Sequence, residues 1–142
     1  MAPSEVRDLL DRQQLTELVS RLGLFLDEQR WDDAPALFTA DATATTPGGT
    51  AVGREALVAQ AARNHTERTQ HVITNCVVDL DGDRAAIGAN LLVTFAPDEG
   101  VGEPRFQLGE RYGFEAQRTG DGWRLSRVQT RPLWRVGEPP AR

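Results

Sequence analysis

The sequence predicts an α+β domain in which a curved, mixed and mostly antiparallel sheet wraps around helices. In the first third of the chain, apolar residues recur at spacings of three and four, which is typical of an amphipathic helix. After residue 70, long runs rich in β-branched residues alternate with turn sequences, which predicts a meander of antiparallel strands. A curved sheet packed around a long helix leaves a cavity in which a small ligand binds.

The helical part of the chain is expected to contain three helices and one short strand. The first helix is indicated by one apolar stripe, formed by Leu15, Leu18, Val19, Leu22 and Leu26. The segments that follow are a short helix at 31–38, a short strand at 42–46, a turn at 46–50 and a helix at 54–67.

The second half is expected to contain four long strands joined largely by turns. The DGD sequence at 81–83 and the TGDG sequence at 119–122 have the composition of hairpin turns. The strands are predicted at 70–80, 84–95, 105–118 and 123–134.

Length, charge and cysteine content limit the class of protein. A chain of 142 residues is the size of one domain, so we expect a single domain over 1–142. The net charge of -5 argues against a nucleic-acid partner or an anionic membrane surface. Cys76 is the only cysteine, so no disulfide forms within the chain. The chain shows no signal peptide and no membrane-spanning stretch, which predicts a cytoplasmic protein.

One carboxylate interrupts an apolar strand face. Between Phe106 and Ala116 every second residue is apolar except Glu110. An unpaired carboxylate is costly to bury, so Glu110 is expected to be paired, protonated or turned toward a polar cavity. The alternative is a purely structural ion pair on this face.

Further polar residues are weaker candidates when judged from their positions alone. His71 begins a strand, and a lone histidine is more often structural than catalytic. Asp27 ends the first helix, where the helix dipole disfavours an acid, so a solvated carboxylate is the simpler interpretation. His65 is expected on an exposed turn, at the surface. Asn75 shares strand parity with His71, and Tyr112 is a possible pocket group.

Several strings resemble the SnoaL-like branch of the nuclear transport factor 2-like superfamily, which includes scytalone dehydratase. They are LDEQRWDDAPALFTADA at 26–42, TQHVITNCVVDLDGDRA at 69–85 and DGWRLSRVQTRPLW at 121–134. Together with the strand between the last two, they cover most of the chain. The resemblance implies a cone-shaped cup with the active site inside.

The resemblance also implies roles for individual residues. The proton-transfer Asp and His of the dehydratase match Asp27, four residues before Trp31, and His71 in the TQH string. A second active-site histidine falls at Glu110, and an amide-bearing residue on the last strand falls at Gln129. Trp31 is expected near the substrate.

Two tyrosines of the dehydratase are replaced in this chain. They hold a water at the substrate carbonyl of the dehydratase, and their positions are occupied here by Leu26 and Thr46. This departure argues against scytalone itself as the substrate.

The leading functional hypothesis is a cofactor-independent dehydratase, isomerase or cyclase. An imidazole held by a carboxylate transfers protons near neutral pH, so the Asp27–His71 pair suits acid–base chemistry on a small apolar oxygenated metabolite, such as a polyketide intermediate. No metal-ligand cluster or phosphate loop is evident, so neither metal nor nucleotide is expected.

Two alternatives remain open. The first is epoxide opening, with Asp27 and Glu110 as the acid–base pair. The second is a non-catalytic ligand-binding or assembly module, which a closed, filled cup would favour. We also expect a homo-oligomer through the outer sheet face, where Arg111, Arg131 and Trp134 lie on late strands.

Overall fold

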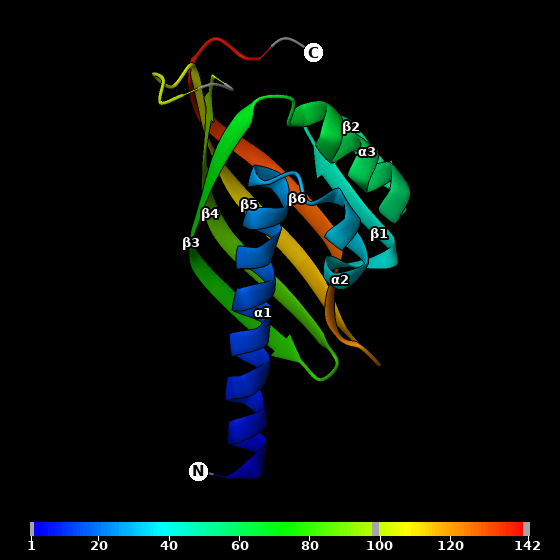
Figure 1. Cartoon of the computed structure of the whole chain (residues 1–142). Coiled ribbons are helices and arrows are strands. Elements are labelled where there is room, and N and C mark those ends of the chain that lie inside the picture. The colour runs from blue at the N-terminus through cyan, green and yellow to red at the C-terminus, as the bar shows by residue number, and fades with distance from the viewer. Residues whose placement is uncertain (1, 98–99, 141–142) are drawn as a thin grey trace.

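A long N-terminal helix crosses the concave face of one curved sheet (Figure 1). The computed structural model describes residues 2–97 and 100–140. The helix, α1, spans Pro3–Asp27, and proline at its first position needs no amide partner there. The apolar stripe expected from the sequence is buried, with Leu15 and Val19 as its most enclosed members, and Phe25 is buried beside it. Its opposite face is exposed, so the predicted amphipathic helix is confirmed.

The second predicted helix is shorter than expected. The segment is divided into a 3-10 turn, η1 (Trp31–Asp33), and the short helix α2 (Ala34–Leu37). Strand β1 (Phe38–Thr46) therefore starts four residues before the predicted strand. Phe38 takes an extended conformation, pairs with Leu125 of the last strand and packs edge-on against Phe25 at 5.6 Å between ring centroids. Phe38 thus belongs to the sheet and not to the predicted helix, because its tertiary contacts favour the extended conformation.

A hairpin and a third helix complete the first half of the chain. The predicted turn joins β1 to β2 (Gly49–Val52), which pair antiparallel. Gly53 then has φ of 92°, a conformation that favours glycine, and α3 (Arg54–Asn64) follows directly. The helix ends three residues before the predicted boundary of 67, and residues 65–67 form a bend that leads into β3.

Four long strands form the rest of the sheet. They are β3 (Arg68–Asp81), β4 (Arg84–Ala96), β5 (Phe106–Thr119) and β6 (Gly122–Gly137). The order across the sheet is β2-β1-β6-β5-β4-β3. Strands β1 and β6 are parallel and the other neighbours are antiparallel, so the predicted α+β class with a mixed sheet is confirmed.

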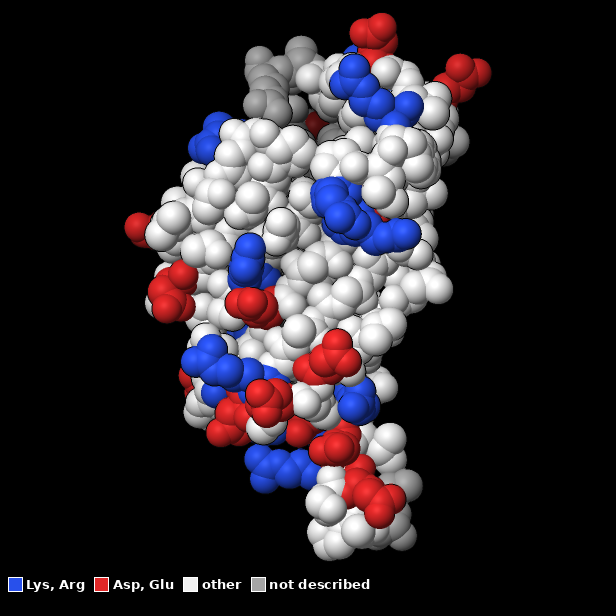
Figure 2. Space-filling view, turned by 180° about the vertical axis from the view of Figure 1, so that it is seen from behind, with Lys and Arg blue, Asp and Glu red and all other residues white. Residues whose placement is uncertain are grey.

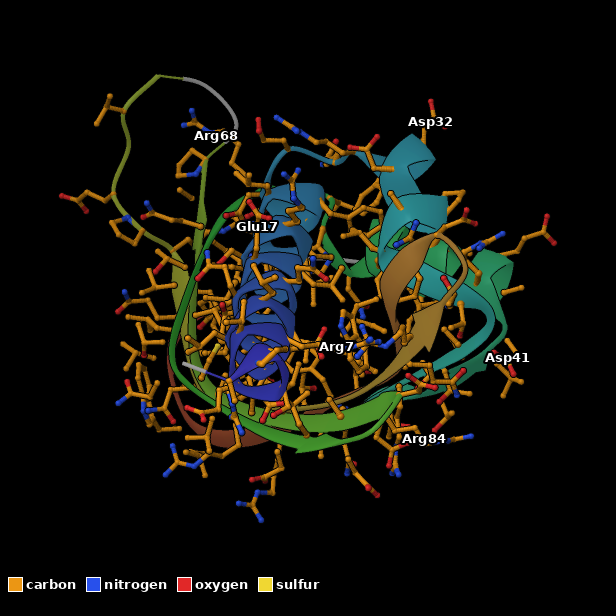
Figure 3. The ribbon with its side chains drawn as sticks, turned by 90° about the horizontal axis from the view of Figure 1, so that it is seen from below. Arg7, Glu17, Asp32, Asp41, Arg68 and Arg84 are labelled. Carbon is orange, nitrogen blue, oxygen red and sulfur yellow. The ribbon has the colours of Figure 1, made fainter. Side chains whose placement is uncertain are left out.

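Bulges change which side chains face the inside of the sheet. In β3 the register shifts between Thr74 and Val77, and Asn75 has φ of 58°. In β6 it shifts between Leu125 and Arg127. A bulge adds one residue to a strand, so odd-numbered residues face inward before each of these shifts and even-numbered residues directly after it. A second shift in β6, between Pro132 and Trp134, returns Trp134 and Val136 to the outer face. The sheet curves around α1, as Figure 3 shows along the helix axis.

The core lies between α1, α2 and the concave face of the sheet. Its sheet side is formed by alternate residues of β4 and β5, such as Leu91, Val93 and Phe114. The convex face has no helix over it, and Figure 2 shows a broad area there without charged side chains. None of the described helices is both long enough and apolar enough to span a membrane.

Candidate active site

A cavity of about 430 Å³ lies inside the curve of the sheet, next to the C-terminal end of α1. The apolar part of its wall includes Leu22, Phe25, Leu26, Leu91, Val93, Phe95, Phe106 and Leu108. Polar side chains also line it, and they include His65, His71, Glu110 and Tyr112. An apolar cavity with a few convergent polar groups is typical of a small-molecule site.

Asp27 and His71 are in direct contact, as the resemblance implied. The Asp27 Oδ1 atom lies 2.5 Å from Nδ1 of the His71 ring. The backbone amide of His71 donates to both carboxylate oxygens, at 2.9 and 3.1 Å. The Thr69 hydroxyl donates to Oδ1 at 2.9 Å. The first residues of β3 thus surround the carboxylate at the end of α1 with donors.

These donors keep Asp27 ionised. Burial by itself raises the pKa of this carboxyl, but hydrogen bonds from the His71 ring, the His71 amide and Thr69 hold the pKa below its ordinary value. They also offset the unfavourable helix dipole at the C-terminus of α1. The solvated carboxylate considered from the sequence is therefore not what the structure contains.

His71 presents its ring to the cavity. The His71 side chain is only 2% exposed, so it is shielded from the outer surface. Because His71 lines the cavity, a ligand reaches its ring from inside the cavity. A carboxylate at Nδ1 accepts a hydrogen bond, so the hydrogen of a neutral ring sits on Nδ1. Nε2 then carries the lone pair, which is the arrangement of an imidazole general base.

Glu110 is buried on the inner face of β5, as the interrupted alternation predicted. The residue is 6% exposed and lines the cavity. Burial raises the pKa of the Glu110 carboxyl to about 7. No residue in the described parts of the chain forms an ion pair with it, so the structural-pair alternative lacks its partner. A carboxyl that holds its proton near neutral pH is suited to donate it.

Tyr112 stands two residues further along the same face. Its ring packs against Phe114 at 4.7 Å between centroids, and it lines the cavity. Burial, and then the nearby charges of Glu110 and Asp27, raise the pKa of its hydroxyl, so the phenol stays neutral. It is available as a hydrogen-bond donor, as the sequence indicated.

The expectation that His65 lies at the surface was wrong. His65 follows the last residue of α3, and its ring lies 5.2 Å from the His71 ring and 6.4 Å from the Phe95 ring, between centroids. It lines the cavity beside His71. The helix ends earlier than predicted, which turns this residue inward. The six-residue spacing between the two histidines was the only signal in the sequence.

Three predicted site residues lie away from the cavity. Asn75 is the exposed residue at the bulge of β3, and Gln129 is exposed on β6, where its amide oxygen accepts from Arg127 at 3.0 Å. The predicted placements of Asn75 and Gln129 were wrong because the bulges reverse the strand parity. Trp31 packs edge-on against Phe25 at 5.1 Å and belongs to the core.

The two positions that replace family tyrosines do line the cavity. Leu26 lies on α1 and Thr46 ends β1, and both contribute to its wall. The wall is therefore more apolar at Leu26 than it would be with tyrosine there. Within residues 2–97 and 100–140, no group of three or more His, Cys, Asp or Glu side chains is placed to hold a metal ion.

Residues 7–129 match the SnoaL-like domain family, and the chain belongs to that family. Its fold is that of the nuclear transport factor 2-like superfamily. A search of curated proteins found no match to the chain.

Three solved structures illustrate the likeness in fold. The Kfla4162 protein from Kribbella flavida is 27% identical, with a TM-score of 0.82 and coverage of 91% of this chain and 95% of its own. A candidate scytalone dehydratase from Novosphingobium aromaticivorans is 18% identical, with a TM-score of 0.80 and coverage of 92% and 89%. A type 2 hexachlorocyclohexane dehydrochlorinase (LinA) is 20% identical, with a TM-score of 0.82 and coverage of 96% and 93%.

Proposed function

We propose that this protein is an acid–base enzyme of the lyase or isomerase type, which removes a proton from a carbon atom next to a carbonyl group. The observation that carries the proposal is the 2.5 Å contact between Asp27 and His71 at the wall of an apolar cavity. The substrate would be a small, largely apolar, oxygenated molecule, such as a polyketide intermediate. Two of the similar structures are named as a dehydratase and a dehydrochlorinase, which is consistent with elimination chemistry.

Each side chain has a defined part in such a reaction. His71 Nε2 takes the proton from carbon, and the ionised Asp27 stabilises the imidazolium that forms. The protonated Glu110 carboxyl donates to the substrate carbonyl oxygen, or to a leaving hydroxyl that departs as water. Tyr112 donates a hydrogen bond to a substrate oxygen.

The two alternatives raised by the sequence receive less support. Epoxide opening by Asp27 and Glu110 would need both carboxyls at the ligand, but only Glu110 is among the described residues that line the cavity. A passive binding or assembly module would be better served by a filled cup. The open cavity next to the Asp27–His71 pair supports the enzyme.

The proposal is tested by proton exchange on a generic ketone. We expect the protein to accelerate hydrogen–deuterium exchange at the carbon next to the carbonyl of 1-tetralone in D2O, followed by NMR. Replacing either partner, as His71→Asn or Asp27→Asn, should slow the exchange by roughly 10²-fold, the usual loss for a general base. Glu110→Gln should slow it as well.

The matched control is Asp11→Asn, which makes the same substitution at another aspartate of α1 that does not line the cavity. It should leave the exchange rate of the folded protein unchanged. Exchange by the His71→Asn variant at the wild-type rate, with 1-tetralone bound, would contradict the proposal.

A further inference from the structure

His65 is held in one orientation by the end of α3. Its Nδ1 atom lies 2.7 Å from the carbonyl oxygen of Ala61, one helical turn earlier. A carbonyl oxygen only accepts hydrogen bonds, so Nδ1 must carry the hydrogen and donate it. The side-chain amide of Gln29 donates to the His65 carbonyl oxygen at 2.8 Å, which fixes the backbone as well. The tautomer of His65 is therefore set by the helix and not by a ligand.

The ring of His65 stays neutral at physiological pH. Burial lowers its pKa to about 4, and the neighbouring His71 ring adds to this effect, while the Ala61 carbonyl and the more distant Asp27 charge oppose it. With one hydrogen, on Nδ1, the ring has an unprotonated Nε2. Within residues 2–97 and 100–140, no donor reaches this atom. His65 therefore brings a hydrogen-bond acceptor without a protein partner to the cavity.

The two imidazoles are neighbours with the same arrangement of hydrogens. Their centroids are 5.2 Å apart with an angle of 34° between the ring planes, and the Phe95 ring stacks on His65 at 6.4 Å between centroids. His71 donates from Nδ1 to Asp27, and His65 donates from Nδ1 to Ala61. In its neutral form each ring leaves Nε2 unprotonated, and both rings line the same apolar cavity. An acceptor in such surroundings is satisfied by a ligand that carries a donor.

We propose that His65 Nε2 accepts a hydrogen bond from a hydroxyl group of the substrate, so that the cavity selects an alcohol or phenol over an ether of the same shape. This inference rests on the proposed function only in placing the substrate in this cavity. His65 determines specificity, and His71 acts on an atom close to the selected hydroxyl.

The chain offers a direct test because it contains only two histidines. Long-range ¹H–¹⁵N NMR spectra of the full chain, labelled with ¹⁵N-histidine, would show two imidazoles, and His65→Asn assigns them. We expect His65 to remain the Nδ1–H tautomer from pH 6 to 8. The probe 2-naphthol should shift the His65 Nε2 signal upfield and bind about tenfold more tightly than 2-methoxynaphthalene.

Two variants separate the acceptor from the packing of the ring. His65→Asn keeps a donor near the Ala61 carbonyl but leaves no acceptor at the position of Nε2, so it should abolish the preference for the naphthol. His65→Gln brings an amide oxygen toward the position of Nε2 and should restore part of the preference.

The inference is overturned by an Nε2–H tautomer for His65, by equal affinity for the two probes, or by no binding of 2-naphthol at millimolar concentration. It is also overturned if bound 2-naphthol leaves the Nε2 signal unchanged. Exchange on 1-tetralone, which has no hydroxyl, is measured separately. A failure of the acid–base proposal and a failure of this inference are therefore distinguishable.

Discussion

Asp27 combines a structural and a chemical task in one side chain. A carboxylate at a helix C-terminus is normally disfavoured, yet Asp27 accepts hydrogen bonds from Thr69 and from the ring and amide of His71. The same contacts join the end of α1 to the start of β3 and orient the imidazole. Loss of Asp27 should therefore affect both proton transfer and the placement of the ring.

Glu110 gives the protein a stability that depends on pH. Its pKa is raised from 4.5 to about 7 by burial, so between these values the folded protein keeps a proton that the unfolded chain has released. The contribution is complete below about pH 4.5 and is lost as the pH rises to about 7. At about 1.4 kcal/mol per pKa unit, the loss is at most about 3.5 kcal/mol.

The measurement is urea unfolding of the wild type and of Glu110→Gln across this pH range. The lowered pKa of His65 acts in the opposite direction, because its contribution increases as the pH rises from about 4 to 6.5. The difference between the two proteins isolates Glu110, and it should change only between about pH 4.5 and 7. A difference that is independent of pH would show that Glu110 is ionised throughout.

How far the site was predictable varied from residue to residue. Glu110 was found by strict alternation within one strand, a local rule that no bulge of β5 disturbs on that face. Asp27 and His71 required the family resemblance, because a helix-ending acid and a lone histidine each have a common structural explanation. His65 was missed because its position depends on the last turn of α3, which sequence periodicity does not define.

At the scale of elements, bulges explain the two misplaced strand residues, Asn75 and Gln129. Residues 123 and 125 face inward, and uninterrupted alternation would place Gln129 on the same side. The extra residue before Arg127 places Val128 and Thr130 inside instead. Asn75 was misplaced by the same effect in β3. The four long strands were predictable from pattern, whereas the short strand β2 was not expected and a single inserted residue leaves no clear mark in the sequence.

A second carboxylate fastens α1 to the opposite end of the sheet. Asp11 is 6% exposed and accepts two hydrogen bonds from Arg118, at 2.9 and 2.7 Å, and one from the Trp123 indole at 3.1 Å. These donors lower the pKa of Asp11, although burial opposes the shift. The Arg118 guanidinium also lies 4.6 Å from the centroid of the Trp123 ring. We expect this cluster to stabilise the fold without touching the cavity.

Asp11→Asn should lower the free energy of unfolding by about 2–3 kcal/mol at neutral pH, because the Arg118 guanidinium loses its negatively charged partner. The control is Asp83→Asn, which removes an exposed carboxylate that binds the same Arg118 at 2.8 Å. Its cost should stay below about 1 kcal/mol, as for other surface pairs. Urea denaturation measures both, and equal losses would contradict the assignment of the buried contact.

At the scale of the whole molecule, the convex face of the sheet has no helix over it. Near the C-terminal end of β6 the exposed apolar side chains include Leu133, Trp134 and Val136. Trp134 lies against the backbone of Gly109 in the neighbouring strand β5. Figure 2 shows uncharged areas on this face between groups of Arg, Asp and Glu side chains. We expect this face to pair with a second copy of the chain, as the sequence indicated.

Light scattering tests the pairing. The wild type should have about twice the mass of the 15.6 kDa chain. Leu133→Glu together with Val136→Glu should shift it toward the monomer, because two charges on each copy would face each other. Leu24→Glu, on the exposed side of α1, is the matched control and should leave the mass unchanged. A wild-type protein that scatters only as 15.6 kDa would rule out the dimer.

Asp11 and Asp27 each bind donors from the sheet, so the number of α1 residues between them is fixed. Asp11 and Asp27 are about four turns apart, and each must point at its own set of donors. Because a helix rotates about 100° per residue, one residue gained or lost between them would swing one carboxylate away from its partners. Before Asp11 no such restriction applies, and there the helix runs past the lower edge of the sheet (Figure 1). Length variation, or fusion to another domain, is therefore compatible with this fold at the N-terminal end of α1 and not in its middle.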